Sequence, residues 1–285
     1  MSAPAGREAV TSMRIRRGRR QLTGLSASLA LIACSAAAPS QAVAGAWTLE
    51  KGKGLVIVTG FASRADKGFA AERKTQAIAG FRKVEIQGLA EYGISDRFTA
   101  RVRTEVRDVR QEGGDPEHRT GLGFSEIGGR YRFFGRGGFV ASAEANLRLA
   151  EVQDLVDPAQ SGLLEAEYEA RLLGGYGFTL RERPSFANVE LAYRARAGDR
   201  PDEIRVDTTF GIRPIPRLLA LAQVFSVVSA GSAESLAPYD YHKVQLSGVY
   251  DVTPRISVQL GGFTTVAGRN ALREDGLLSA LWFRF

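Results

Sequence analysis

Residues that build metal and redox sites are nearly absent from this sequence. Its 285 residues contain one cysteine, Cys34, and two histidines, His118 and His242. A single cysteine excludes a disulfide framework within the chain, and cysteine and histidine form no cluster with metal-ligand spacing. Neither histidine begins an H-x-S pattern, and nucleophilic catalysis needs serine and histidine within hydrogen-bond reach. We therefore predict no catalytic residues, no metal site and no cofactor, and we do not expect an enzyme.

Net positive charge is small outside the first 44 residues of the chain. The formal net charge is +7, from 38 Lys and Arg against 31 Asp and Glu. Residues 1–44 hold six arginines and one glutamate, which leaves 32 basic and 30 acidic side chains in residues 45–285. A nucleic-acid-binding protein would carry its basic surface in the folded body. We therefore expect no nucleic-acid partner.

The first 44 residues have the three parts of a secretory signal peptide. A cationic segment, "MRIRRGRR", begins at Met13, and an apolar segment, "LTGLSASLALIA", follows it. The small residues "AVA" at 42–44 complete the pattern as a cleavage site. The sequence predicts a signal peptide over residues 1–44, with translation starting at Met1 or Met13, and one domain over residues 45–285.

Two other interpretations of the leader remain open. "LIAC" at 31–34 fits a lipoprotein box, in which Cys34 would become an acylated N-terminus. "RRQL" at 19–22 resembles a twin-arginine signal. Cleavage after Ala44 is preferred because Pro39 and "AVA" form a complete signal-peptidase site.

Long hydrophobic runs are also missing after residue 45, where no stretch reaches the 18 or more apolar residues of a membrane-spanning helix. Apolar and polar residues alternate instead, as in β-strands. Within residues 98–107, for example, Phe98 and Val102 share one face, and Arg101 and Arg103 share the other. A half-buried antiparallel sheet in a soluble protein would show the same alternation. Periodicity alone therefore leaves a soluble sheet and a membrane barrel as alternatives.

The number and spacing of the segments favour the barrel. Tight links such as "GISD" and "GRGG" alternate along the chain with longer polar links such as "RQEGGDPEHRT". Outer-membrane barrels have an even number of strands, short periplasmic turns and longer external loops. We therefore predict an all-β fold, an antiparallel transmembrane β-barrel of about 12 strands in the bacterial outer membrane. The expected strands are residues 52–62, 80–92, 97–109, 121–134, 139–150, 166–180, 185–197, 203–213, 217–229, 241–252, 256–267 and 276–285.

The last strand ends with apolar side chains at alternate positions, Leu281, Phe283 and Phe285. In a barrel this strand must pair with the first, because lipid offers no hydrogen bonds to a free strand edge. A terminal strand of this kind resembles the signal that the barrel-assembly machinery of Gram-negative bacteria recognises. We therefore expect that machinery, outer-membrane lipids and lipopolysaccharide as partners.

Aromatic residues fit two girdles at the membrane interfaces. The expected periplasmic girdle comprises Tyr92, Phe98, Phe133, Phe134, Phe139, Phe178, Phe186 and Tyr250. The expected outer girdle comprises Phe61, Phe124, Tyr168, Tyr193, Phe225 and Tyr241.

Two motifs suggest a family. "GAWTLEKGKGLVIVTG" at 45–60 and "EYGISDRFTARV" at 91–102 resemble the XagA-like outer-membrane proteins of proteobacteria. The turn within the second motif also recurs in barrels associated with phenol-degradation pathways. The resemblance implies an outer-membrane barrel, in some cases linked to exopolysaccharide and biofilm, and it carries no catalytic residues.

The inward parity of the strands supplies the candidate functional surface, which is densely charged. One hypothesis is a narrow, porin-like channel for small polar or anionic solutes, selected by this surface. The alternative is a closed lumen filled by ion pairs, in a surface or export component that works with exopolysaccharide export proteins. Twelve strands do not decide between them, because about 8 strands leave room only for side chains and 16 to 18 leave an aqueous channel. The residues predicted to line the lumen are Arg101, Arg103, Glu105, Arg130, Arg132, Glu144, Arg148, Glu167, Glu169, Arg171, Glu190, Arg194, Arg205 and Asp207.

Overall fold

The computed structural model describes residues 45–112, 117–152, 163–198, 200–231 and 237–285. The predicted signal peptide, with Cys34 and the cleavage site after Ala44, lies outside the described residues. All regular secondary structure within the described ranges is β-strand. In the same ranges, no helix is long and apolar enough to cross a bilayer.

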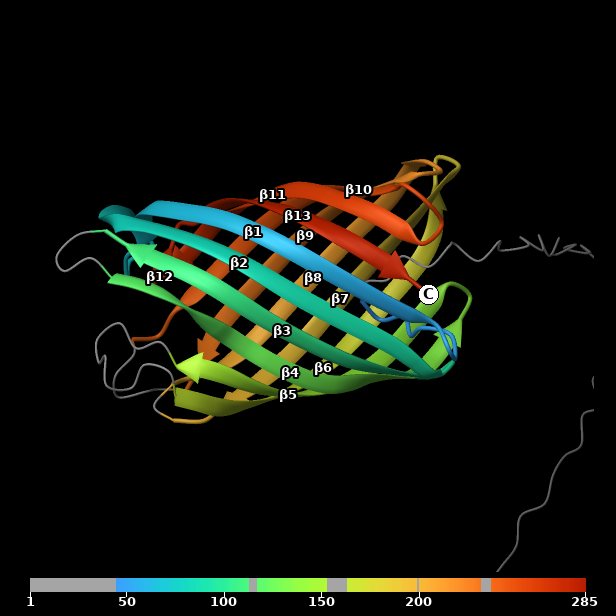
Figure 1. Ribbon diagram of the computed structural model, residues 1–285, viewed down its shortest axis with the longest axis horizontal. Helices are drawn as coiled ribbons and strands as arrows, with labels where there is room; N and C mark the ends of the chain where they lie inside the picture. Colours follow the sequence, from blue (N-terminus) through green and yellow to red (C-terminus); the bar gives the residue numbers. More distant parts are fainter. Residues whose placement is uncertain (1–44, 113–116, 153–162, 199, 232–236) are drawn as a thin grey trace, which may run out of the picture. The chain divides into compact units, whose positions relative to one another are not determined.

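The strands form one closed antiparallel barrel (Figure 1). Consecutive strands from β1 to β11 pair with each other, β11 pairs with β13, and β13 pairs with β1, so the sheet has no open edge. Twelve strands make the wall, because β12 is a two-residue strand beside the end of β1. The predicted fold class is confirmed. The strands are β1 (Gly54–Phe69), β2 (Thr75–Ser95), β3 (Phe98–Gln111), β4 (Glu117–Arg136), β5 (Phe139–Val152), β6 (Leu163–Leu180), β7 (Arg183–Arg196), β8 (Asp202–Ile215), β9 (Leu218–Ala230), β10 (Asp240–Asp251), β11 (Ile256–Arg269), β12 (Ala271–Leu272) and β13 (Asp275–Arg284).

Apolar side chains face outward and polar side chains face inward. In β3, Val102 and Val106 are 51% and 49% exposed, whereas Glu105 between them on the other face is 4% exposed. Outward apolar residues recur on the other strands, among them Ile86, Ile127 and Leu260. A soluble sheet would bury these residues, so the outward belt is the surface that a barrel turns to lipid.

The links between strands are short at one end of the barrel. Two residues connect β2 to β3, β4 to β5, β6 to β7 and β8 to β9, and four connect β10 to β11. Gly137 and Gly138, with φ of 60° and 87°, make the second of these turns in the left-handed conformation that tight hairpins need. The chain ends at the same end of the barrel (Figure 1). We refer to it as the short-turn end.

At the opposite end the strands extend further than the sequence predicts, most of all in the first hairpin. Residues 63–75 were expected to form a connection, but β1 continues to Phe69 and β2 begins at Thr75. The two strands remain paired beyond the apolar belt, with Lys67 opposite Ala77 and Phe69 opposite Thr75. Polar residues there occupy both faces of the hairpin, so the alternation that marks a strand in lipid is lost.

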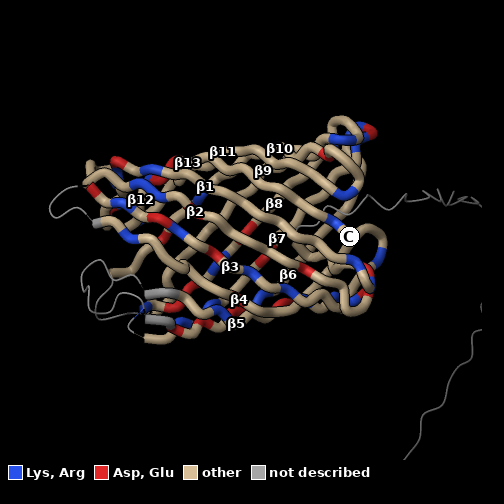
Figure 2. The backbone as a smooth tube through the Cα atoms, in the orientation of Figure 1, with Lys and Arg blue, Asp and Glu red and all other residues tan. Residues whose placement is uncertain are grey.

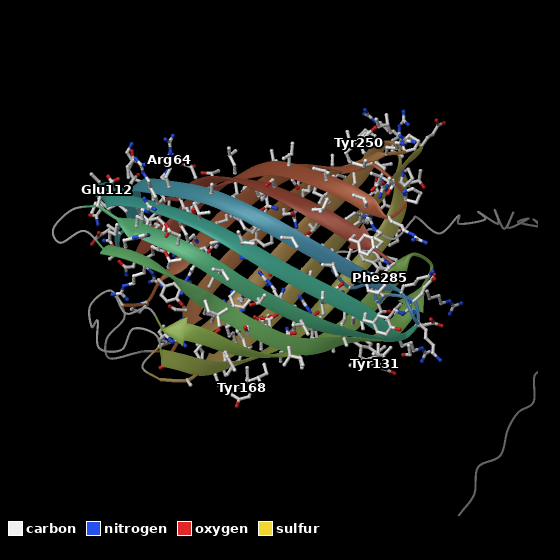
Figure 3. The ribbon with its side chains drawn as sticks, viewed as in Figure 1. Arg64, Glu112, Tyr131, Tyr168, Tyr250 and Phe285 are labelled. Atoms are coloured by element: carbon white, nitrogen blue, oxygen red, sulfur yellow. The ribbon has the colours of Figure 1, made fainter. Side chains whose placement is uncertain are left out.

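The aromatic residues agree with the predicted girdles in part. Most of the expected periplasmic set faces outward at the short-turn end, where Figure 3 shows Tyr131, Tyr250 and Phe285. Phe186 is an exception, since it is buried inside the barrel. At the other end Tyr168 and Tyr193 are exposed. The rest of the expected outer girdle was placed wrongly and lines the interior: Phe61, Phe124, Phe225 and Tyr241.

Candidate functional site: the barrel interior

A segment before β1, Gly45–Leu49, folds into the barrel at the short-turn end; we term it the inner segment. Ala46 is fully buried, and its backbone N–H donates to Oδ1 of Asn188 in β7 at 2.9 Å. Its carbonyl accepts a hydrogen bond from the Ser142 hydroxyl of β5. The Leu49 N–H donates to Oγ1 of Thr99 in β3 at 2.8 Å. These wall residues therefore satisfy backbone groups of a segment that belongs to no strand.

Apolar side chains fill the interior around the inner segment. The ring of Trp47 meets the ring of Phe186 edge to face, with centroids 5.7 Å apart. A buried cluster surrounds this pair and includes Leu49 of the inner segment. Its other members come from the wall: Leu55, Ile57, Leu219, Leu221, Val249, Ala280 and Trp282. The core of the protein thus lies at the short-turn end and narrows the lumen there.

Ion pairs hold the neighbouring part of the wall to the inner segment. Glu144 in β5 accepts hydrogen bonds from Arg101 of β3 and from Arg130 of β4. Arg130 also lies 3.3 Å from Glu91 and donates to the carbonyl of Trp47 at 3.0 Å. Buried ions need such partners, because removing a charge from water costs on the order of several kcal/mol per ion.

A second group of ion pairs spans β6, β7 and β8. The Arg171 guanidinium contacts Glu169 at 2.9 Å, Asp207 at 2.8 Å and also Glu190. Arg194 reaches Glu169 at 2.7 Å. Glu169 binds arginines of β6 and β7, and Arg171 binds carboxylates of β6, β7 and β8, so the group cross-links that side of the wall.

Two lumen arginines have weaker acidic partners. Arg103 donates to the Gln87 side chain at 3.0 Å. The Arg148 guanidinium carbon lies 3.7 Å from the centroid of the Phe124 ring, and its Nε lies 3.5 Å from Glu167. Phe124 faces inward because it shares the parity of the inward Glu126 and Arg130 on β4. The two arginines flank this ring, and in the register of the sheet both lie directly opposite the buried Glu126 of β4.

The opposite wall of the lumen is polar but uncharged at mid-height. Gln245 donates to Gln223 at 2.9 Å, and the Trp282 indole N–H donates to Gln259 at 3.0 Å. Figure 2 shows charged residues along β3 to β8, whereas β9 to β11 and β13 carry them mainly near their ends. The lumen therefore has a charged side and a glutamine side.

These side chains surround a cavity of about 920 Å³. Twelve basic and ten acidic residues line it. Of the residues predicted to line the lumen, Arg132 lies outside this cavity, at the short-turn end, where it donates to the Asp96 carbonyl at 2.8 Å. The cavity brings the others together: Arg101, Arg103, Glu105, Arg130, Glu144, Arg148, Glu167, Glu169, Arg171, Glu190, Arg194, Arg205 and Asp207.

A further buried carboxylate lies at the far end of the cavity, between β12 and β13. Glu274 accepts hydrogen bonds from Ser63 and Lys243, and Lys83 lies 3.3 Å away. Burial acts to raise the pKa of the Glu274 carboxyl, but Lys83 and Lys243 outweigh it and lower the pKa to about 2. The sequence analysis missed this residue because it follows a polar link rather than a strand.

The two histidines lie on the outer wall. His242 Nδ1 is 2.9 Å from Oγ of Ser226, directly opposite it on β9, so the structure supplies a serine that no H-x-S pattern indicated. A catalytic pair needs a third group to orient the imidazole. Asp240 is 4.0 Å from His242, and both of its oxygens are bound by Arg73 at 2.7 Å. The pair is therefore a cross-strand polar contact, and the described residues contain no group of three potential metal ligands.

The fold and the lipid-facing belt define this protein as an outer-membrane β-barrel, as the sequence predicts. No family model and no curated protein matches the chain, so the XagA-like resemblance stays a prediction. The fold is similar to the COG4313 outer membrane channel from Pseudomonas putida F1, with a TM-score of 0.66 at 13% identity, over 84% of this chain and 98% of that one.

Two other solved structures share the fold. The NanC porin matches with a TM-score of 0.51 at 8% identity, over 80% of this chain and 98% of that one. The β domain of the Bordetella autotransporter BrkA matches with a TM-score of 0.53 at 12% identity, over 82% and 100%. Such low identities establish the barrel architecture and leave the solute and the state of the lumen to this chain's own residues.

Proposed function

We propose that the protein is a narrow, porin-like channel of the outer membrane for small polar solutes, with a modest preference for anions, and not an enzyme. The observation that carries the proposal is the charged cavity of about 920 Å³ inside a closed barrel. A solute that loses its hydration water in the cavity meets charged side chains on one wall and glutamines on the other. These groups can replace the hydrogen bonds that the water made. The similarity to structures described as a channel and a porin supports the same function.

The preference for anions follows from the distribution of partners. Twelve basic against ten acidic residues leave the cavity with only a small positive excess. Carboxylates tightly bind Arg130 and Arg171, so their charge is largely neutralised. Arg103 and Arg148 share one directly opposite carboxylate, Glu126, so two guanidinium groups face one negative charge there and are the best placed to attract an anion. We therefore expect selectivity to respond to Arg103 more than to the total charge of the wall.

A specific observation favours the alternative of a closed lumen. The inner segment and the apolar cluster occupy the short-turn end, and ion pairs cross-link the wall above them. In that case the loops, rather than the lumen, would act in a surface or export role linked to exopolysaccharide. A channel requires the inner segment to leave enough room, or to move, for solute to pass.

Planar-bilayer recording tests the channel. The purified wild-type barrel should give stable single-channel steps with a weak anion preference. Arg103→Glu should reverse the preference towards cations, because it reduces the positive charge of the cavity by two units beside Phe124. Arg132→Glu is the matched control, since it makes the same change outside the cavity and should leave the reversal potential unchanged. Silence of the wild type over repeated insertions, with a knockout that alters biofilm matrix but not solute uptake, would establish the closed alternative.

A further inference from the structure

Three arginines form a row on the lipid-facing wall, away from the lumen. In the register of the sheet, Arg64 of β1 lies directly opposite Arg82 of β2, and Arg82 lies directly opposite Arg110 of β3. The Arg82 and Arg110 side chains are 72% and 63% exposed. Figure 3 shows Arg64 projecting from the outer face, near the end of the barrel opposite Phe285.

Like charges at directly opposed cross-strand positions are destabilising, so anionic partners would stabilise this row of arginines. The described residues provide such partners unevenly. Arg110 has Asp108 at 3.1 Å, and Arg82 has only the exposed Glu112 at 3.7 Å. Arg64 makes no hydrogen bond or ion pair with any described residue. The uncompensated positive charge therefore lies at Arg64 and Arg82.

Besides Glu112, a second acidic residue borders these two arginines. Asp275 of β13 lies opposite Arg64 on the other side of β1. Its Oδ1 accepts a hydrogen bond from the Thr264 hydroxyl at 2.5 Å, which directs the carboxylate towards β11. The space between Arg64 and Arg82 is thus the place on this wall that suits an added anion.

Beside the two arginines, the outer wall is hollowed into a groove of about 910 Å³, which we term the wall groove. Small residues form its floor, Ala62, Gly262 and Gly276, and larger apolar side chains border it, Val84, Leu246 and Leu277. Leu246 and Leu277 are 62% and 70% exposed. The groove is therefore a largely apolar hollow in the wall, with Arg64, Arg82 and Asp275 at its edge.

The position of the arginines along the barrel matches the outer membrane interface. Gly54 lies opposite Tyr92, a residue of the periplasmic girdle, and Arg64 is ten residues further along β1. At a rise of about 3.3 Å per residue and a tilt of about 40°, ten residues span about 25 Å across the membrane. The apolar band of outer-membrane barrels is about 25 Å tall. Arg64 and Arg82 thus lie where the hydrocarbon ends and phosphorylated headgroups begin.

We propose that Arg64 and Arg82 bind a phosphate group of lipid A, the acylated anchor of lipopolysaccharide, while one of its acyl chains lies in the wall groove. A ligand that joins a phosphate to an acyl chain satisfies both features at once. Arginine suits the headgroup because its planar guanidinium donates paired hydrogen bonds to phosphate oxygens. The site is independent of whether the lumen conducts.

A binding assay with purified hexa-acyl lipid A tests the headgroup contact. The folded barrel in neutral detergent is titrated with the lipid, and bound lipid is counted by native mass spectrometry. Arg64→Glu/Arg82→Glu should weaken binding at least tenfold. Arg217→Glu/Arg255→Glu is the matched control, because it makes the same charge change at exposed positions of the short-turn end and should bind like the wild type. Wild-type affinity in the Arg64→Glu/Arg82→Glu variant overturns the proposal.

Two further experiments test the phosphate and the acyl chain of the ligand separately, and neither needs a charge variant. Dephosphorylated lipid A should bind the wild-type barrel at least tenfold more weakly than lipid A, and millimolar inorganic phosphate should not compete with lipid A. Ala62→Trp fills the wall groove without altering charge and should also weaken lipid A binding. Equal binding of the dephosphorylated lipid, or full competition by inorganic phosphate, contradicts the assignment. Unchanged binding by Ala62→Trp refutes the acyl contact.

Discussion

At the scale of single residues, the barrel depends on carboxylates that stay ionised in buried positions. Glu274 is 4% exposed and holds Lys83 and Lys243 together at the end of the cavity opposite the inner segment. Its pKa is lowered from 4.5 to about 2 in the folded protein. A carboxylate with a depressed pKa stabilises the fold above its unfolded pKa, and this stabilisation is lost as the pH falls through the folded pKa.

Glu274→Gln should therefore lower the free energy of unfolding at pH 7 by about 3 kcal/mol, from about 1.4 kcal/mol per pKa unit. The difference between variant and wild type should shrink as the pH falls from 4.5 towards 2, because the wild-type carboxyl then becomes protonated. Urea unfolding in lipid vesicles at pH 7, 4.5 and 2.5 measures this difference in the free energy of unfolding. Glu50→Gln, at an exposed carboxylate, should show no such trend. A difference that stays constant with pH would mean that Glu274 acts through shape rather than charge.

At the scale of secondary-structure elements, β13 closes the barrel and also carries the predicted assembly signal, and experiments can separate the two. It pairs with β1 from Leu55 opposite Arg284 to Arg64 opposite Asp275, and the backbones of Phe285 and Gly54 exchange hydrogen bonds of 3.0 and 2.8 Å. Its outward side chains, Leu281, Phe283 and Phe285, are 53%, 43% and 52% exposed, so they contribute little to packing within the barrel. Recognition by the assembly machinery remains the role predicted for them.

Phe285→Ala keeps the backbone pairing and removes only the ring. We expect a several-fold loss of folded protein in the outer membrane of cells, and near-normal folding of the purified chain into vesicles. Unboiled, folded protein migrates faster on a gel than boiled protein. The amount of the faster band measures the folded protein in cells and in vesicles. Phe134→Ala is the control, because Phe134 is similarly exposed at the same end, 49%, but lies in β4. Equal yields in cells for the two variants would refute the assembly signal.

At the scale of the whole molecule, the proposed channel predicts that passage through the lumen depends on the inner segment, which is not part of the wall. Trp47 and Leu49 pack into the apolar cluster at the short-turn end. Trp47→Ala/Leu49→Ala removes this packing and leaves every strand unchanged. We expect bilayer recordings of the variant to show larger or longer openings than the wild type. The outward pair Leu246→Ala/Leu260→Ala serves as the control, and unchanged conductance in the Trp47 variant would mean that the inner segment does not limit passage.

Much of the wall was predictable from the sequence, and the interior was not. Alternation with period two fixes which side of a strand faces lipid, so the twelve segments and the outward Val102 and Leu281 could be inferred locally. The inner segment lacks any such pattern, and its contacts with Asn188 and Ser142 join residues 142 and 96 positions apart.

The register of the strands accounts for the other differences between the sequence prediction and the structure. Leu122 faces outward although it shares the parity of the inward Phe124, because a bulge shifts β4 by one residue between them, and no sequence pattern marks that bulge. Ser226 meets His242, and Arg64 meets Arg82, only because of the pairing between strands. Since a shift of one residue moves every side chain to the other face, such pairs require the structure.

The closure of the barrel by β1 and β13 has a kinetic consequence. Leu55 and Arg284 lie 229 positions apart in the chain, yet they are direct partners. Contacts between distant residues slow folding, because a large loop must close before any bond forms. Until the last residues are translated, the edge of β1 has no final partner and is a site for aggregation. We therefore expect β1 to stay unpaired on that edge until β13 is available, and the pairing of these two strands to be the last step of folding.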